Sequence, residues 1–495
     1  TARLALSMMR AFLSACVGLA FAASAWAQSF NDLDFEQECD TCASGSLYWR
    51  ISWQSPNVRC HMDNVDGQRA LLISSTAANG VGLVEQAAAL TDTAQLHIVK
   101  LSAMMRSEGV EGGRGAGLYF TGCDAEGRVV FSQDLGFGSF KWALGTRAAQ
   151  RYTIQAICPT GVSVLKLGLI LYGQGRVWFD DVVFTSSTLE GRTPSPQATA
   201  YIDAACDTIR LNSLRKDSVD LPALRAMALR IAGDANDPAD HHLAVGYLLQ
   251  GLEDHHSFLM EPDVAALWQG GGDDTAPIAP VVHRVIQGCG YIAIPPFMSN
   301  DSALIAAFVD TIQQALSTFD AQGVKGWIID QRNNTGGNMA PMVCGLGPLF
   351  DPGVLGQLVD VNGHARRWSY ANGSYGWDGE EEVRAPHPVV LSQQRPIAVL
   401  IGPRTGSSGE SSTICFVGNS RTRLFGDPTW GLTTGNGSFD LPDGAKMFLA
   451  STVMADRNGH VFHGPIAPDE RVDQPADWSY DAALEAALRW IERQP

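Results

Sequence analysis

Residues 397–410 read IAVLIGPRTGSSGE, and the organisation of the whole chain is best worked out from this stretch. The five apolar residues at its start predict a strand, and the apolar-rich residues Ser411 to Val417 can continue the chain as a helix. Small residues between the two let the backbone turn sharply and hold a hydroxyl at the helix start. Such a turn either caps the helix or presents a serine nucleophile beside an oxyanion site. The turn alone does not decide between these interpretations.

Composition limits the classes of protein that fit. The 495 residues are enough for two or three domains, each with its own core. Hydrophobic residues make up 45% and charged residues 18%, as in an ordinary globular protein. The net charge of −17, without any basic run, argues against a nucleic acid partner.

The first 27 residues have the pattern of a signal peptide. An apolar run from Ala11 to Ala23 follows Arg10, and Ala25-Trp26-Ala27 supplies the small-x-small pattern of a cleavage site before Gln28. The run is too short for a stop-transfer helix, and no later segment reaches membrane-spanning length. We therefore expect an exported mature protein, periplasmic or secreted, without a membrane span.

Export makes disulfides possible. Five cysteines crowd the first third of the mature chain, and we expect one or two bridges among them, with a connectivity that the sequence does not give. They are Cys39, Cys42, Cys60, Cys123 and Cys158. The four later cysteines lie in apolar surroundings and are expected to be buried thiols. They are Cys206, Cys289, Cys344 and Cys415.

Residues 28–187 predict an all-β sandwich, because short alternating apolar runs are separated by turns rich in Gly and Asp. Leu33–Glu36 and Gly175–Val182 resemble the first and last strands of jelly-roll domains of the carbohydrate-binding-module type. That resemblance implies a structural calcium ion held by acidic residues such as Glu36 and Asp180. The domain either binds a glycan or another cell-surface ligand, or serves as an accessory packing domain.

Residues 188–198 form a polar, proline-containing linker, and the periodicity then changes from 2 to 3.6. Residues 199–270 predict a helical cap, with helices over Tyr201–Arg210, over Leu221–Ile231 and from a cap at Asp240 to about Leu252. Residues 271–495 alternate strands and helices, which predicts an α/β domain with a largely parallel sheet.

One strand of this domain ends in a glycine pair. Gly326–Asp330 is continuously apolar up to its final aspartate, and the following loop contains Gly336 and Gly337. Paired glycines after a strand expose backbone N–H groups, which suits an oxyanion hole or an anion-binding nest.

Two pairs of histidines raise the question of a metal site. His241 and His242 stand 14 residues before His255 and His256, about 20 Å apart along a continuous helix. That separation argues against a shared ion. We expect no metal and no other cofactor in the site of the α/β domain.

Four stretches in register resemble the family of C-terminal-processing (tail-specific) and tricorn-type serine peptidases. They are DHHS at 254–257, DQRNNTGG at 330–337, TGSSGE at 405–410 and Pro468-Asp469. The resemblance runs from about Tyr201 to the C-terminus and implies a ClpP/crotonase-like α/β fold with a helical cap. It also implies a peptide or protein substrate.

The resemblance assigns roles to individual residues. Ser407 corresponds to the family's nucleophile, with Ser408 as the fallback. In the Ser-Lys branch a lysine follows the serine by 25 residues, but Leu432 stands there, so that mechanism is excluded. The tricorn-like branch uses the histidine that maps to His256 as its base.

The oxyanion donors and the carboxylate that would orient the histidine are the remaining parts of the expected catalytic site. The Ser408 N–H, with an N–H of Gly336 or Gly337, would stabilise the oxyanion. No carboxylate occurs from Asn458 to Ala467, where the tricorn enzymes place their glutamate, so Asp254 and Glu410 are the substitutes and a dyad without a third member is the alternative.

The family's usual PDZ domain has no room here, because only 30 residues separate Met260 from Tyr291. The chain therefore resembles the PDZ-less branch, and the sandwich could tether substrate instead. The leading hypothesis is an exported serine peptidase with a Ser-His dyad. The alternatives are an esterase or amidase on the same site, and a non-catalytic surface- or glycan-binding protein with a degenerate peptidase domain.

Overall fold

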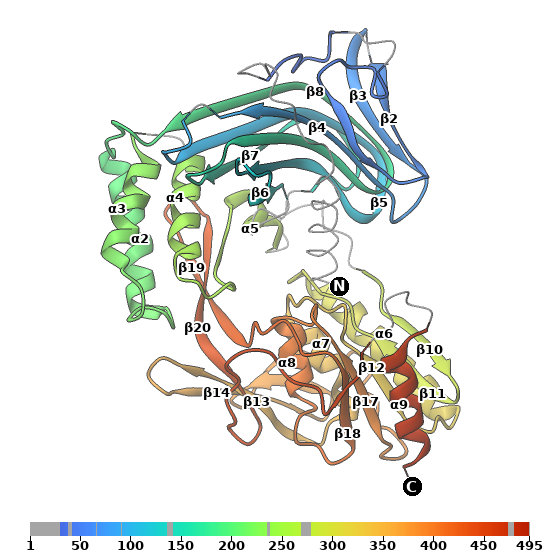
Figure 1. Cartoon of the computed structure of the whole chain (residues 1–495). Coiled ribbons are helices and arrows are strands. Elements are labelled where there is room, and N and C mark those ends of the chain that lie inside the picture. The colour runs from blue at the N-terminus through green and yellow to red at the C-terminus, as the bar shows by residue number, and fades with distance from the viewer. Residues whose placement is uncertain are drawn as a thin grey trace.

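The computed structural model describes residues 30–37, 42–65, 67–90, 92–135, 142–234, 238–268, 279–473 and 480–494. The predicted signal peptide, residues 1–27, and Cys39 lie outside these residues. Figure 1 shows a β-sandwich at the top, a group of helices beneath one end of it, and further sheets with their helices below.

The sandwich is entirely antiparallel and follows the strand order β1-β4-β8-β3-β2, with β5 joined to β6, β7 and β8. Its strands are β1 (Arg50–Gln54), β2 (Val58–Val65), β3 (Gln68–Ser75), β4 (Val81–Ala89), β5 (His97–Cys123), β6 (Val129–Asp134), β7 (Gly145–Cys158) and β8 (Val164–Thr188). The all-β expectation holds for these residues.

Two of these strands differ from the expected short runs. β5 and β8 have 27 and 25 residues and pair along most of their length. Their register shifts at irregularities such as the one between Ser102 and Met104, and such bulges let a long pair bend. Alternate residues of both strands fill one core, in which Leu118, Phe120 and Phe179 are fully buried.

Three helices follow the linker, at the places where the sequence predicted them: α2 (Pro196–Asn212), α3 (Leu221–Ala232) and α4 (Pro238–Gln250). The Ser195 hydroxyl caps α2 and the Asp220 carboxylate caps α3. Asp240 lies inside the first turn of α4 instead of capping it, because that helix already begins at Pro238.

The α/β domain contains a six-stranded sheet of order β10-β11-β12-β17-β18-β21. All neighbours are parallel except β10 and β11, as the alternating pattern predicted. The strands are β10 (Val282–Ile286), β11 (Cys289–Ala293), β12 (Trp327–Asp330), β17 (Ile397–Ile401), β18 (Thr422–Gly426) and β21 (Glu470–Arg471).

Helices cover both faces of this sheet. They are α6 (Ser302–Ala321), α7 (Met339–Leu346), α8 (Ser408–Ile414) and α9 (Ala482–Glu492), with a 3-10 turn η1 (Gly347–Leu349). Ile329 and Val399 point to the core shared with α6 and α7, whereas Ile328 and Ala398 point to α9. Burial on both faces explains why these strands are continuously apolar.

A second, antiparallel sheet was not predicted from the sequence. Its order is β16-β15-β14-β13-β20-β19, and the short β9 joins β20. The strands are β9 (Phe258–Met260), β13 (Gly353–Asp360), β14 (Ala365–Ala371), β15 (Ser374–Trp377), β16 (Glu380–Arg384), β19 (Thr434–Asp440) and β20 (Lys446–Asp456). A short helix α5 (Pro262–Trp268) follows β9.

The β19–β20 hairpin reaches up to the helical cap (Figure 1). At its tip, Asp443 accepts hydrogen bonds from the Tyr201 hydroxyl at 2.7 Å and from the His242 ring at 2.5 Å. Leu441 and Met447 join the core of the three helices, which also contains Ile98 of β5. The hairpin therefore connects the site region to the cap and, through the cap, to the sandwich.

Within the described ranges, we find no helix that combines the length and the apolar character needed to cross a membrane.

Candidate active site

Parallel pairing of β12 with β17 brings two sequence motifs together. Asp330 lies beside Leu400, so both strands end at the same edge of the sheet, and the loop at 331–338 meets the turn at 402–407. The Gly406 N–H donates to the Asn334 carbonyl at 3.0 Å, and the Thr405 hydroxyl donates to the Gln331 carbonyl at 2.9 Å. The contact is so close that a β-carbon at Gly409 would lie 2.3 Å from the Asn334 carbonyl oxygen.

Ser407 stands at the turn into α8 with φ of 52° and ψ of −120°. A positive φ is uncommon for a residue with a side chain and indicates local strain. The Ser407 N–H donates to the Glu410 carboxylate at 3.0 Å, which holds the turn in place. The turn therefore both caps the helix, as one interpretation had it, and leaves the Ser407 hydroxyl half-buried at its corner.

Glu410 is fully buried and ties this turn to the next loop. Its other carboxylate oxygen accepts hydrogen bonds from the Thr429 hydroxyl at 2.5 Å and the Gly431 N–H at 2.8 Å. Burial raises the pKa of Glu410 to about 7, although these donors act in the opposite direction. All of its contacts are to the backbone and to Thr429, so Glu410 does not orient a histidine ring.

His256 lies in the turn between α4 and β9. Asp254 shapes this turn by accepting the N–H groups of His256 at 2.9 Å and Ser257 at 2.8 Å, and the Ser257 hydroxyl at 2.5 Å. The pairing of β9 with β20 then fixes the turn against the α/β domain. The prediction that Asp254 could orient the imidazole is therefore wrong, because its carboxylate oxygens accept hydrogen bonds from two backbone N–H groups and from the Ser257 hydroxyl.

The His256 ring contacts Ser407. Its Nε2 lies 2.9 Å from the Ser407 Oγ, across 151 positions of sequence. His256 is 9% exposed, and burial lowers its pKa to about 4, against a smaller opposing effect of the Asp254 charge. The ring is therefore neutral at ordinary pH and can accept the serine proton.

The other ring nitrogen of His256 has a partner that was not predicted from the sequence. The His256 Nδ1 lies 2.6 Å from the Thr434 Oγ1, at the start of β19. Two residues further along, the Asn436 side-chain amide donates to the His256 carbonyl at 2.9 Å. The sequence carries no signal for this pairing beyond the position of Thr434 shortly after Leu432.

Gly336 and Gly337 both adopt positive φ, 107° and 116°. The Gly336 N–H donates to the Asn334 side chain at 3.0 Å, whereas the Gly337 N–H has no hydrogen-bond partner among the described residues. The Ser408 hydroxyl donates to the Gly337 carbonyl at 2.5 Å, whereas the hydroxyl that contacts His256 is that of Ser407. Of the two glycines, Gly337 has the N–H that is free to receive an oxyanion.

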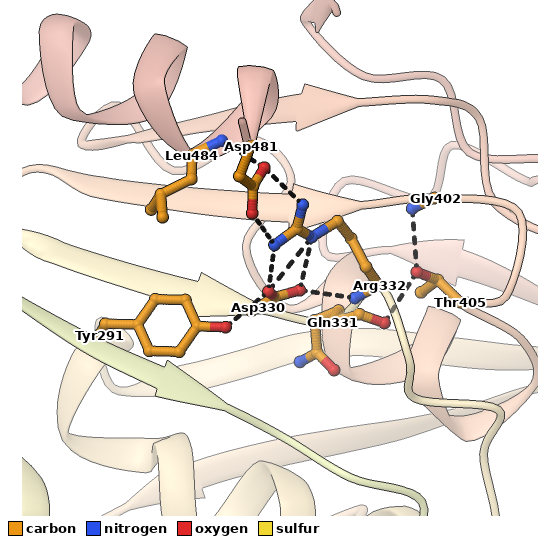
Figure 2. A network of polar contacts seen from close by, with 8 residues as sticks. All are labelled: Tyr291, Asp330, Gln331, Arg332, Gly402, Thr405, Asp481 and Leu484. Carbon is orange, nitrogen blue, oxygen red and sulfur yellow. Dashed lines mark hydrogen bonds and ion pairs between the residues drawn. The ribbon is translucent and has the colours of Figure 1, made fainter. Parts of the chain in front are cut away.

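A partly buried ionic network fixes the base of the glycine loop, and Figure 2 shows it at close range. The Arg332 guanidinium binds the Asp330 carboxylate at 2.6 Å and the Asp481 carboxylate at 2.8 Å through two nitrogens. The Tyr291 hydroxyl donates to Asp330 at 2.8 Å. Asp481 also caps α9 through the Leu484 N–H, so the loop after β12 is attached to the C-terminal helix.

Leu432 lies beside the turn that carries Ser407. Its Cδ1 would be 3.7 Å from a β-carbon at Gly406. Lys446, the next lysine along the chain, pairs with Asp440 at 2.5 Å at the opposite end of β19. These positions agree with the exclusion of a Ser-Lys mechanism.

The two pairs of histidines have different surroundings. His242 binds Asp443, and His255 is exposed beside the buried His256. Burial raises the pKa of Asp180, and the charges of Asp181, Glu36 and Asp34 act in the same direction. Within the part of the chain that the structure describes, no group of three His, Cys, Asp or Glu side chains is arranged to hold an ion. Calcium binding at Glu36 and Asp180 stays a prediction.

The four later cysteines are buried thiols, as expected: Cys206, Cys289, Cys344 and Cys415. Of the N-terminal group, Cys42 is disulfide-bonded. Cys60, Cys123 and Cys158 are buried in the sandwich and form no disulfide.

The sandwich carries a polar hollow of about 790 Å³ on β2, β3, β5 and β8. Its lining includes Arg59, Ser74, Glu108 and Arg176, which stand side by side on the four paired strands. Glycan binding by this domain stays a prediction.

Comparison with known proteins identifies the class of this domain. Residues 288–472 match the model of peptidase family S41. The match includes Ser407 and both glycines, whereas His256 precedes it. The resemblance to C-terminal-processing peptidases is thereby confirmed.

Individual relatives agree with this assignment. Over 204 residues the chain is 31% identical to the nisin-resistance protein of Lactococcus lactis subsp. lactis, covering 41% of this chain and 60% of that protein. Over 211 residues it is 29% identical to the carboxyl-terminal-processing protease of Synechocystis sp., covering 40% and 44%. The matches thus span about half the length of these relatives.

A solved structure supports the fold. A lipoprotein from Streptococcus agalactiae superposes with a TM-score of 0.50 at 22% identity, over 60% of this chain and 97% of that one.

Proposed function

We propose that this chain is an exported serine peptidase that cleaves peptide bonds through an acyl-enzyme with a Ser-His pair. The observation that carries the proposal is the 2.9 Å contact between the His256 Nε2 and the Ser407 Oγ. Ser407 lies in the stretch that matches peptidase family S41, and His256 precedes that stretch. A nucleophile and a base within hydrogen-bond reach are the minimum that acyl transfer requires.

In this mechanism, neutral His256 accepts the Ser407 proton as Oγ attacks the substrate carbonyl carbon. The resulting oxyanion receives hydrogen bonds from the N–H groups of Ser408 and Gly337. His256 then gives the proton to the leaving amine, the C–N bond breaks, and the acyl group remains on Ser407. A water molecule, activated by the same histidine, releases the acyl group and restores the serine.

Several features support the roles of the supporting residues. The Gly337 N–H has no hydrogen-bond partner among the described residues, and its neighbour Gly336 packs so closely that a β-carbon there would lie 2.9 Å from the Ser407 Cβ. Glu410 holds the backbone of Ser407 and therefore positions the nucleophile without touching substrate.

The substrate class and the location are also proposals. An S41 domain implies a peptide or protein substrate. Export rests on the signal-peptide pattern of residues 1–27 and on the disulfide at Cys42. We further propose the ClpP/crotonase-like type for the α/β domain and the jelly-roll type for the sandwich.

The test is cleavage of a mixture of unstructured peptides by the mature protein, followed by mass spectrometry. We expect new termini with wild type, and a loss of at least about 1,000-fold in rate for Ser407→Ala and for His256→Gln. Ser438→Ala removes an exposed hydroxyl from β19 and should leave the rate unchanged.

Two results would contradict the proposal. Peptide cleavage that survives Ser407→Ala would place the nucleophile elsewhere. Turnover of esters without any peptide cleavage would favour an esterase on the same site.

A further inference from the structure

The ring of a catalytic histidine needs a partner on the nitrogen that faces away from the nucleophile. When Nε2 accepts the Ser407 proton, Nδ1 must carry the ring's own hydrogen, and a buried N–H without an acceptor is costly. In the tricorn-type pattern a carboxylate supplies that acceptor. Neither carboxylate near this site does so, because Asp254 and Glu410 bond to backbone N–H groups and to the hydroxyls of Ser257 and Thr429.

We propose that Thr434 is the third member of the site, a positioning residue whose hydroxyl accepts the Nδ1 hydrogen of His256. This inference rests on the proposed serine peptidase function. Its basis is the 2.6 Å distance between the Thr434 Oγ1 and the His256 Nδ1, within the ordinary range for a hydrogen bond.

The strand that carries Thr434 is itself held firmly. Thr434 pairs with Val453 of β20, and the preceding Thr433 hydroxyl lies 3.0 Å from the Gly464 carbonyl oxygen. The Asn436 amide binds the His256 carbonyl. β19 thus fixes both the ring and the backbone of His256, so that the ring cannot rotate freely away from Ser407.

A hydroxyl does only part of what a carboxylate would do. It fixes the tautomer and the orientation of the ring, but it adds no negative charge to stabilise the imidazolium form. The negative charge of Asp254 raises the pKa of His256 without a hydrogen bond to the ring, but the larger effect of burial lowers that pKa. The site should therefore hold a histidine that is well oriented yet protonates only in acid.

The experiment measures the rate at which a fluorophosphonate probe labels the full mature protein, as a function of pH. Thr434→Val removes the hydroxyl at nearly constant shape, and we expect labelling to slow about 10- to 100-fold. Thr434→Ser returns the hydroxyl and should restore the rate to within about threefold. Ser438→Ala on the same strand is the matched control and should label like wild type.

The pH profile adds a readout that packing alone would not change. Thr434→Asp places a carboxylate against Nδ1, which favours the charged imidazole, so the acid limb of the profile should move to higher pH by about one unit or more. If Thr434→Val does not fold, as judged by circular dichroism, Thr434→Ala makes the same deletion with less steric demand.

The outcomes separate this inference from the proposed function. Wild type that is not labelled, or labelling that persists in Ser407→Ala, overturns the serine peptidase proposal. Labelling that depends on Ser407 but proceeds at the wild-type rate in Thr434→Val overturns the role of Thr434 alone. Equally slow labelling of Thr434→Val and Thr434→Ser also overturns the role of Thr434, since the loss of rate would then come from altered packing and not from the missing hydroxyl.

Discussion

At the scale of single residues, the site depends on buried polar groups whose partners are fixed. His256 is held at both ring nitrogens, by Ser407 and by Thr434, and at its backbone by Asp254. Ser407 is strained in φ and held by Glu410. Strain that persists because the surroundings determine it is common where a side chain must face substrate.

The low pKa of His256 gives a prediction about pH. The base works when neutral, and burial lowers its pKa to about 4, so the probe-labelling rate should stay flat from pH 8 to about pH 5 and halve near pH 4. Because the folded pKa is depressed, His256 also contributes stability that is present above about pH 6.5 and is lost as the pH falls through 4. A rate that halves near pH 6.5 would contradict the burial of this ring.

Gly337 gives a second prediction at this scale. In Gly337→Ala the new β-carbon would lie 2.2 Å from the Phe297 carbonyl oxygen, and the loop must move. We expect the peptide-cleavage rate constant to fall about 100-fold or more, since an oxyanion donor is displaced.

Gly353→Ala is the matched control for this substitution. Its φ of 122° is similarly positive, but nothing lies near the new atom. The control should lose stability from backbone strain and keep its activity. Equal losses of activity in the two variants would mean that backbone strain, not the oxyanion position, is responsible.

At the scale of elements, parallel pairing of β12 with β17 assembles the site, because it brings the ends of both strands to one edge. The loop after β12 is then held by the Arg332 network of Figure 2, and through Asp481 by α9. The same network attaches the last helix of the chain to the sheet, so the folding of α9 and the position of the glycine loop depend on each other.

Arg332→Met tests this connection. It leaves Asp330 and Asp481 without their common cation, and truncating one partner of a largely buried ion pair typically costs about 3 kcal/mol of unfolding free energy. We expect urea unfolding to show a loss near this size, together with slower labelling of Ser407. Arg366→Met, at an exposed pair with Asp378, should change the stability by less than about 1 kcal/mol. Similar losses in both variants would contradict the role of the network.

At the scale of the whole molecule, the sandwich, the cap and the peptidase core share contacts. The core of the three helices includes Ile98 from β5 and Leu189, which follows β8, on one side and Leu441 and Met447 of the β19–β20 hairpin on the other. The strand that bears Thr434 is therefore anchored at its far end to the cap, and the cap is packed on the sandwich.

Ile98→Asp tests the coupling between the sandwich and the cap. The side chain is 8% exposed in that shared core, and burying an unpaired carboxylate there is strongly unfavourable. We expect calorimetry to show one thermal transition for wild type and two separated transitions for the variant. Two transitions already present in the wild type would contradict the coupling.

The sequence predicted those features in which a local pattern and its physical cause coincide. The strand at 397–401 was predictable because burial on both faces demands a continuous apolar run. The contact of His256 with Ser407 could be anticipated because both stand in short motifs that resemble those of serine peptidases, and their catalytic roles stay a proposal.

Other features had no such pattern. The strands from β13 to β16 carry exposed charged residues, such as those of Glu380–Glu382, and obtain their stability from neighbours distant in sequence. Thr434 is one hydroxyl on a glycine-rich strand, and its importance follows only from a contact across 178 positions. Asp254 was expected to orient the His256 ring. Because it lies only two positions before His256, its carboxylate accepts the backbone N–H groups of the turn instead.

The central claim is that Ser407 is the nucleophile activated by His256. Mass spectrometry of the intact mature protein, and then of its peptides, after treatment with a fluorophosphonate tests it most directly. We expect one phosphonyl group per chain, on Ser407, absent in Ser407→Ala and formed at least about 100-fold more slowly in His256→Gln. A phosphonyl group on Ser408 or elsewhere, or one that forms on Ser407 at an undiminished rate without His256, would contradict it.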